Sequence, residues 1–316
     1  MSRFLRILVT AVIWAGLITA PYWLREVGGY TSLGSRVVIL GLAAMSLNFL
    51  LGFTGVLSFG HAAYFGLGAY GAGLTIKYLM PNTLAGIGVG IAIGTLAAMI
   101  IGALIVRLRG VYFAMVTIAF GQVFYFIAFR WHEVTGGDDG LGGWQKIPIH
   151  IGSWVFDIAT NEVNFYYFSL ICFAIATGIM AILLSSPFGA TLVAIRENER
   201  RARFLGIRIE QHIWLSFVIS CLFVSLAGAL FALLNNFADP RFLRWDQSGT
   251  FVIMAVLGGM RSFWGPLLGA AIYVVLQDYV SSITENWMSI IGAFFMAVVL
   301  FFPRGLFGLF RWKAAA

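Results

Sequence analysis

"IWLSFVISCLFVSLAGALFALL", from Ile213 to Leu234, contains no charged residue. The hydrocarbon core of a bilayer is about 30 Å thick, and a helix of roughly 20 apolar residues crosses it. This run is long enough for one crossing, and comparable runs recur from one end of the chain to the other. The pattern predicts a protein that crosses a membrane many times.

Ten apolar segments predict an all-α integral membrane protein with about ten transmembrane helices. Two late segments, 250–260 and 266–279, are too short to cross the core upright. They either cross at an angle or form a re-entrant pair, which would leave eight crossings. The predicted segments are Ile7–Trp23, Val37–Leu51, Leu57–Leu79, Leu84–Val106, Val111–Phe129, Tyr166–Leu184, Ile213–Leu234, Thr250–Met260, Pro266–Tyr279 and Trp287–Phe302.

The composition leaves no room for a separate soluble domain. Of the 316 residues, 60% are hydrophobic and 10% are charged, whereas soluble domains are closer to half apolar and a quarter charged. Residues 1–316 therefore read as a single polytopic transmembrane domain. The net charge of +7 does not indicate a nucleic-acid partner, because the basic residues lie in short segments between apolar runs. Cys172 and Cys221 lie inside such runs and predict neither a disulfide nor a metal site.

The distribution of charge predicts the orientation. Basic residues gather at 107–109, at 196–208 and near the C-terminus (Arg304, Arg311 and Lys313), whereas loop 130–165 is net acidic. Positively charged segments stay in the cytoplasm. We therefore expect both termini and loop 185–212 to be cytoplasmic and loop 130–165 to be periplasmic.

The N-terminal residues resemble a signal peptide, with Arg3 and Arg6 ahead of an apolar stretch. However, Pro21 would directly follow a cut after Ala20, and the apolar run continues to Trp23. We expect an uncleaved first span.

The sequence predicts no catalytic residue, no metal site and no cofactor bound by this chain. "GLGAYG", residues 66–71, matches the dinucleotide fingerprint, but a preceding strand and a following acidic residue are missing. The chain has no phosphate-binding loop of the G-x-x-x-x-G-K-[ST] type, and its four histidines lack metal-ligand spacing.

"GFTGVLSFGHAAYFGLGAYGAG", residues 52–73, combines closely spaced glycines with polar residues and predicts a kinked or partly unwound helix. Such backbone is tolerated at membrane depth only inside protein or along a wet cavity. His61 either lines a polar path or only bonds a neighbouring carbonyl group. The residues predicted to line the path of a solute are Asn48, Ser58, Gly60, His61 and Gln122.

Two stretches suggest an internal repeat. "SFGHAAYFGLGAY", residues 58–70, is similar to "SFWGPLLGAAIY", residues 262–273. Interrupted segments in corresponding positions of two halves mark the substrate route of many transporters. Chance similarity in sequence rich in glycine and alanine is the alternative.

"VAIRENERRARFLGI", residues 193–207, holds far more charge than the rest of the chain. Positive-inside anchoring explains its arginines but neither its glutamates nor the length of loop 185–212. Its composition favours a short cytoplasmic helix that docks a partner protein, with Leu192, Ile195, Phe204, Leu205 and Ile207 supplying apolar contact.

"TGGDDGLGG", residues 135–143, is an acidic, glycine-rich patch in the predicted periplasmic loop. It is either a solvated turn or a landing site for an extracytoplasmic partner, with Asp138 and Asp139 as contacts. It lacks the ligand spacing of a calcium loop.

Six stretches together give the chain a family resemblance between about residues 36 and 309. They are "GFTGVLSFGHAAYFGLGAY", "RLRGVYFAMVTIAF", "TGGDDGL", "AIRENERRARFLGI", "AVLGGMRSFWGPLLGAAIY" and "FFPRGLFGL". In this order they resemble the permease subunits of bacterial importers for branched-chain amino acids that are driven by ATP-binding-cassette ATPases. Ala202-x-x-x-Gly206 also resembles the core of the coupling loop of such importers, although Arg200 stands where that motif has a glutamate.

The resemblance implies a division of labour among several chains in the inner membrane of a bacterium. A second related permease subunit completes the pathway, two cytoplasmic ATPases bind ATP and Mg²⁺, and a periplasmic binding protein delivers the solute. The solute is a branched-chain amino acid or a similar small polar molecule. The residues expected to couple to the ATPases are Arg196, Glu197, Glu199, Arg200, Arg201, Ala202, Arg203 and Gly206.

The main alternative is a carrier or channel that works alone and is driven by an ion gradient. Such proteins bury ionisable residues within their spans. Here the spans offer only His61, Lys77 and Asp278. A membrane enzyme is a further alternative, but the sequence shows no pairing of a nucleophile with a base.

Overall fold

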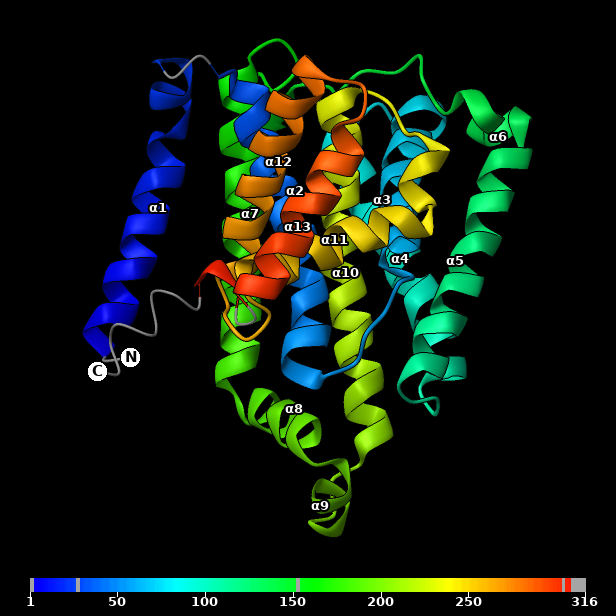
Figure 1. The fold of residues 1–316 in the computed structure, drawn as a ribbon. Coiled ribbons are helices and arrows are strands. Elements are labelled where there is room, and N and C mark those ends of the chain that lie inside the picture. Colours follow the sequence, from blue (N-terminus) through cyan, green and yellow to red (C-terminus); the bar gives the residue numbers. More distant parts are fainter. Residues whose placement is uncertain (1–2, 27–28, 152–153, 303–304, 308–316) are drawn as a thin grey trace.

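The computed structural model describes residues 3–26, 29–151, 154–302 and 305–307, which form a helical bundle (Figure 1). The predicted helical class is confirmed, with one addition: two short strands pair antiparallel inside loop 130–165. The C-terminal basic residues Arg304, Arg311 and Lys313 lie outside the described residues, as does the C-terminus. The helices are α1 (Arg3–Glu26), α2 (Thr31–Thr54), α3 (His61–Leu74), the π-helix η1 (Thr75–Leu79), α4 (Thr83–Ile105), α5 (Val111–Arg130), α6 (His132–Thr135), η2 (Gly137–Asp139), α7 (Glu162–Ser185), α8 (Pro187–Glu197), α9 (Glu199–Phe204), α10 (Ile209–Asn235), η3 (Pro240–Leu243), α11 (Trp245–Gly258), α12 (Gly265–Ile283) and α13 (Trp287–Phe301), and the strands are β1 (Ile149–Ile151) and β2 (Trp154–Phe156).

Within the described part of the chain, seven helices are long and apolar enough to cross a membrane: α1, α2, α4, α5, α7, α10 and α12. The other three predicted crossings correspond to α3 with η1, to α11 and to α13. The 14 residues of α11 extend about 21 Å at 1.5 Å per residue, which is less than the apolar core of a bilayer. The total of ten crossings, or eight with a re-entrant pair, stays a prediction.

Helices α2 and α10 form the centre of the bundle. In α2, 83% of the apolar window is buried, and in α10 the share is 72%, against 17% in α1. Helix α2 packs against α7, α10, α11 and α12, while α10 also packs against α3 and α4. Helix α1 lies at one side of the bundle (Figure 1). Movement of α2 would therefore act on several helices at once.

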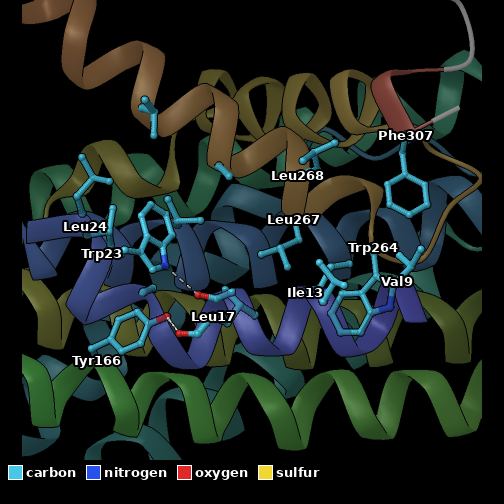
Figure 2. Close-up of a pocket in the computed structure, with 18 of the residues that line it drawn as sticks. Val9, Ile13, Leu17, Trp23, Leu24, Tyr166, Trp264, Leu267, Leu268 and Phe307 are labelled. Carbon is cyan, nitrogen blue, oxygen red and sulfur yellow. Dashed lines mark hydrogen bonds between the residues drawn. The ribbon is translucent and has the colours of Figure 1, made fainter. Parts of the chain in front are cut away.

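An apolar cavity of about 580 Å³ is lined by residues of α1, α2 and α12 (Figure 2). It is bridged at its edges by hydrogen bonds, from the Tyr166 hydroxyl group to the Leu17 carbonyl group at 2.5 Å and from Trp264 Nε1 to Thr10 Oγ1 at 3.2 Å. None of its lining residues carries a charge. Such a lining suits hydrocarbon and not a polar solute.

The predicted break in residues 52–73 is present. Helix α2 ends at Gly55, whose φ of 80° is left-handed, and α3 begins only at His61, four residues later than the predicted span. The freed N–H groups find side-chain acceptors on other helices: Phe59 donates to Thr117 Oγ1 at 3.2 Å and Ala62 donates to Ser248 Oγ at 2.8 Å. The irregular backbone is thus satisfied inside the protein, as membrane depth requires.

The turn between α11 and α12 reaches the last turns of α2. Asn48 donates from Nδ2 to the carbonyl oxygen of Ser262 at 3.0 Å. Helix α12 begins three residues after Ser262, just as α3 begins three residues after Ser58. The two stretches of the suggested repeat therefore share a local structure, a short loop that leads into a helix.

Helices α8 and α9 lie at one end of the bundle, together with the first residues of α1 (Figure 1). Helix α6 and loop 130–165 lie at the other end (Figure 1). This separation agrees with the predicted placement of loops 130–165 and 185–212 on opposite sides. Which end faces the cytoplasm stays a prediction from charge.

Candidate functional site

Residues 185–212, which we call the α8–α9 segment, fold into two short helices where the sequence predicted one. The break lies at Asn198, which has an extended φ of −159°. Its side-chain Oδ1 accepts a hydrogen bond from the Arg201 N–H group at 2.9 Å. Asparagine is a preferred N-cap residue because it satisfies a free donor of the first helical turn, so it starts α9 as a new helix.

The inner face of the α8–α9 segment is apolar and enclosed. Ile195 and Ala202 pack with Ile209 and Ile213 of α10 in a small core of their own. Gly206 then ends α9 with a φ of 81°, a conformation that side chains with a Cβ rarely adopt. In Ala202-x-x-x-Gly206 the alanine thus anchors the helix and the glycine turns the chain back toward α10.

Four charged side chains brace α9 against the bundle. Arg109 Nε lies 3.0 Å and 3.1 Å from the two carboxylate oxygens of Glu199. Arg203 lies 2.7 Å from Glu210 and 3.5 Å from Glu199. Arg109 also reaches Glu210 at 3.6 Å. Because this network joins the α4–α5 turn, α9 and α10, it holds α9 in a defined position.

The tip of α9 is apolar and exposed. Phe204 is 89% exposed and Leu205 is 74% exposed. Nearby, Glu197, Arg200 and Arg201 are exposed, and in the described structure their side chains make no ion pair or hydrogen bond. An apolar pair surrounded by free charges of both signs is typical of a protein contact surface.

Arg196 connects the α8–α9 segment to the centre of the bundle. It lies on α8, and its guanidinium group donates to the carbonyl oxygen of Gly52 in the last turn of α2. Gly52 in turn lies so close to Met260 and Asn48 that an added Cβ would overlap both. Helix α8, the end of α2 and the α11–α12 turn therefore form one continuous contact.

His61 is fully buried, and both of its ring nitrogens are within hydrogen-bonding distance of serines. Nδ1 lies 3.0 Å from Ser58 Oγ and Nε2 lies 2.8 Å from Ser220 Oγ. Phe217 contacts the imidazole ring edge-on, with 5.9 Å between ring centroids. In this conformation His61 occupies the interface between α3 and α10, and its partners are hydroxyl groups, not the neighbouring carbonyl group of the alternative interpretation.

The remaining predicted path residues lie on two helices and in the loop between α2 and α3. Gly60 packs on α5 so closely that an added Cβ would lie 2.6 Å from the Thr117 carbonyl oxygen. Asn48 is buried on α2, and its Oδ1 has no hydrogen-bond partner among the described residues. Gln122 is partly exposed on α5. The structure therefore brings Ser58, Gly60 and His61 together.

Asp138 and Asp139 are exposed in η2, at the end of the bundle opposite the α8–α9 segment. Asp138 lies 3.7 Å from Nδ1 of His132. Both carboxylates face solvent, as a landing site requires. Among the described residues, no group of three or more metal-ligating side chains gathers here or elsewhere.

Each of the three ionisable residues that the sequence assigned to the predicted spans has a partner. His61 bonds serines, Lys77 donates to the Gly142 carbonyl oxygen at 2.9 Å, and Asp278 accepts from the Tyr30 hydroxyl group at 2.6 Å. Arg36 also approaches Asp278, at 4.0 Å.

Sequence reasoning did not identify Arg109 and Glu210 as parts of the α8–α9 site. Arg109 was assigned only to the basic segment 107–109 that predicts the orientation, and Glu210 was not singled out. Only a three-dimensional structure shows that the α4–α5 turn reaches α9, because residues 109 and 199 are far apart in the chain.

Comparison with known proteins indicates one family. A family model described as "Branched-chain amino acid transport system / permease component" matches residues 30–301. The chain is similar to the high-affinity branched-chain amino acid transport system permease protein LivM of Escherichia coli K12, with 26% identity over 96% of this chain and 74% of that protein. It is also similar to LivM of Salmonella typhimurium, with 25% identity over 96% of this chain and 74% of that protein, and to LivH of Escherichia coli K12, with 23% identity over 91% of this chain and 96% of that protein. No solved structure matches the chain.

Proposed function

We propose that this chain is the membrane-spanning subunit of an ATP-driven importer for branched-chain or related amino acids. The reason is that the chain belongs to the branched-chain amino acid transport permease family. The observation that carries the mechanism is the exposed tip of α9. Phe204 and Leu205 project from a helix that four charged residues and a small apolar core hold in place. A rigid helix that presents apolar side chains to water is suited to a partner protein.

In the proposed mechanism that partner is one of two cytoplasmic ATPases. These chains bind ATP and Mg²⁺, and the permease binds neither. Closure of the ATPases moves the α8–α9 segment, and the Arg196–Gly52 contact carries the movement into α2. The spans then switch between outward-open and inward-open states. The residues proposed to couple are Arg196, Glu197, Glu199, Arg200, Arg201, Ala202, Arg203 and Gly206.

The other proposed partners follow from the family and the topology. Similarity to both LivM and LivH supports a pair of related permease subunits. A periplasmic solute-binding protein docks on loop 130–165, with Asp138 and Asp139 as contacts. The assembly lies in the inner membrane of a bacterium. Asn48, Ser58, Gly60 and Gln122 line the solute path, and His61 either lines it or only packs beside it.

A carrier that works alone is not favoured, because the relatives are permease components of transport systems. The test is leucine uptake by proteoliposomes that contain the permease pair, with and without the ATPases, ATP and the binding protein. We expect uptake only with all components present. Uptake by the permease alone under an ion gradient would contradict the proposal.

The same preparation tests the solute. Leucine, isoleucine and valine are compared with urea and an aromatic amino acid, each with a binding protein that carries it. We expect the branched-chain amino acids to be imported. If the permease pair imports only urea, the result would agree with the proposed transport mechanism but contradict the proposed class of substrate.

A further inference from the structure

A polar groove of about 690 Å³ lies between the α4–α5 turn, α9 and the start of α10. Four arginines and two glutamates contribute to its walls: Arg107, Arg109, Arg203, Arg208, Glu199 and Glu210. Two positive charges therefore remain when the carboxylates are balanced. The groove is distinct from the exposed tip of α9, since neither Phe204 nor Leu205 lines it.

The carboxylates of the groove are already engaged. Glu199 bonds Arg109 and Glu210 bonds Arg203. In contrast, the side chains of Arg107 and Arg208 are exposed and have no hydrogen bond or ion pair within the described structure. The groove thus offers two free guanidinium groups, the donors that bind phosphate oxygens in a bidentate manner.

The groove also lies where apolar helices end. Arg107 follows the last turn of α4, and Arg208 directly precedes α10. On the neighbouring turns of α4 and α5, Leu104 is 65% exposed, Val111 is 67% exposed and Tyr112 is 73% exposed. Helix α9 projects beyond this level (Figure 1). Free arginines beside exposed apolar side chains match a ligand with an anionic head and hydrocarbon tails.

We propose that this groove binds the phosphate group of an anionic phospholipid, with Arg107 and Arg208 as its ligands and the acyl chains along the exposed face of α4 and α5. A free phosphate ion would use the same donors but would gain nothing from Leu104, Val111 and Tyr112. A bound headgroup also contacts the wall that Glu199 and Arg203 form. Its presence therefore stabilises the position of α9.

The test is native mass spectrometry of the purified permease complex titrated with phosphatidylglycerol or with phosphatidylcholine of the same chains. We expect preferential retention of phosphatidylglycerol. In Arg107→Gln with Arg208→Gln that retention should weaken about 25-fold, because each arginine near an anionic lipid contributes a factor of roughly five. Replacement of both by lysine should restore most of it.

The matched control is Arg200→Gln with Arg201→Gln, which removes two exposed arginines that do not line the groove. We expect normal lipid retention in this variant. Equal binding of the two lipids by the wild type would overturn the proposal even if a variant failed to fold. Unchanged retention in the groove variant would also overturn it.

Two further outcomes would assign the groove to a different ligand. Competition by millimolar inorganic phosphate as effective as that by phosphatidylglycerol would assign the groove to a free anion and contradict the lipid. Loss of ATPase co-purification in the groove variant, with lipid retention unchanged, would assign the groove to the ATPase interface and contradict it as well.

Discussion

The guanidinium group of Arg196 donates to the carbonyl oxygen of Gly52, and this bond joins α8 to the last turn of α2. The last four carbonyl groups of a helix have no partner within it. In α2 the carbonyl group of Leu51 accepts from the Gly55 N–H group, and Arg196 satisfies the next one. A positive charge at this position also complements the dipole of α2. Since α2 is the most enclosed of the seven long helices, displacement of α8 acts directly on the centre of the bundle.

Arg196→Met removes the donor and keeps an unbranched apolar side chain. Hydrogen bonds to charged groups contribute about 1.5–3 kcal/mol, so the link between α8 and α2 should weaken. We expect solute uptake to fall about tenfold or more, while ATPase co-purification stays normal because Arg196 does not belong to the exposed tip. Uptake and co-purification are measured on the same membranes.

Arg196→Lys is the matched control, since it keeps a positive donor of similar length. We expect it to retain more uptake than the methionine variant. Equal and normal uptake in both variants would show that the contact with Gly52 plays no part in coupling.

The orientation predicts which cysteines are accessible from each side. Glu197→Cys and Asp139→Cys are suitable probes because both native side chains are exposed, and Cys172 and Cys221 are first replaced by alanine. In intact spheroplasts we expect an impermeant maleimide to label Asp139→Cys and not Glu197→Cys. In inverted vesicles the result should be reversed. The opposite pattern would invert the proposed topology.

Much of this fold could be predicted from hydrophobicity alone. Within the membrane each span must form hydrogen bonds between its own backbone groups, so a long apolar run predicts a helix. The interruption at residues 52–73 was also predictable, since glycines mark it. The ends of α2 and α3 were less so: the predicted span began at Leu57, whereas Gly55 and Ser58 belong to a loop whose acceptors lie on distant helices. The acceptors are Thr117 and Ser248, which are far from this loop in the sequence. The sequence alone therefore does not identify them as its hydrogen-bond partners.

The candidate site was predictable as a charged segment but not as a structure. Charge density marked residues 196–203, yet the helix break at Asn198 and the link from Glu199 to Arg109 depend on three-dimensional contacts. Sequence also grouped Leu192, Ile195, Phe204, Leu205 and Ile207 as apolar contacts. The structure divides them: Leu192 on α8 is buried, whereas Phe204 is exposed because α9 turns its other face, with Ala202, toward α10.

His61 either lines the solute path or only packs beside it, and measurements of stability and of KM distinguish these two roles. In this structure its ring is enclosed and bonds Ser58 and Ser220. A buried donor or acceptor left without its partner costs about 1–3 kcal/mol. We expect Ser220→Ala to lower the thermal stability of the purified permease and to leave the KM for uptake unchanged.

Ser216→Ala is the control for that change. Ser216 is equally buried on α10 but is not a hydrogen-bond partner of His61. Its hydroxyl group bonds within its own helix and approaches Thr54. A rise of KM in Ser220→Ala alone, without loss of stability, would show that His61 contacts the solute.

The exposed tip of α9 gives the sharpest prediction. Phe204→Ser with Leu205→Ser removes apolar surface that is 89% and 74% exposed among the described residues, so the permease should fold and enter the membrane normally. Burial of each large apolar side chain contributes about 1.5–3 kcal/mol. If both side chains insert into the ATPase, affinity for it should fall at least about 100-fold. Co-purification and ATPase stimulation by loaded binding protein are the measurements.

Charge is tested separately at the same surface. Arg200→Glu with Arg201→Glu should also weaken ATPase binding, because like charges brought together at an interface cost several kcal/mol. Arg200→Gln with Arg201→Gln should have a smaller effect, since exposed charges contribute under about 1 kcal/mol each to stability. Full ATPase binding and full stimulation in both the serine and the glutamate variants would leave the cluster as a topological anchor only. A defect in the glutamate variant alone would mean that charge, and not the apolar pair, makes the contact.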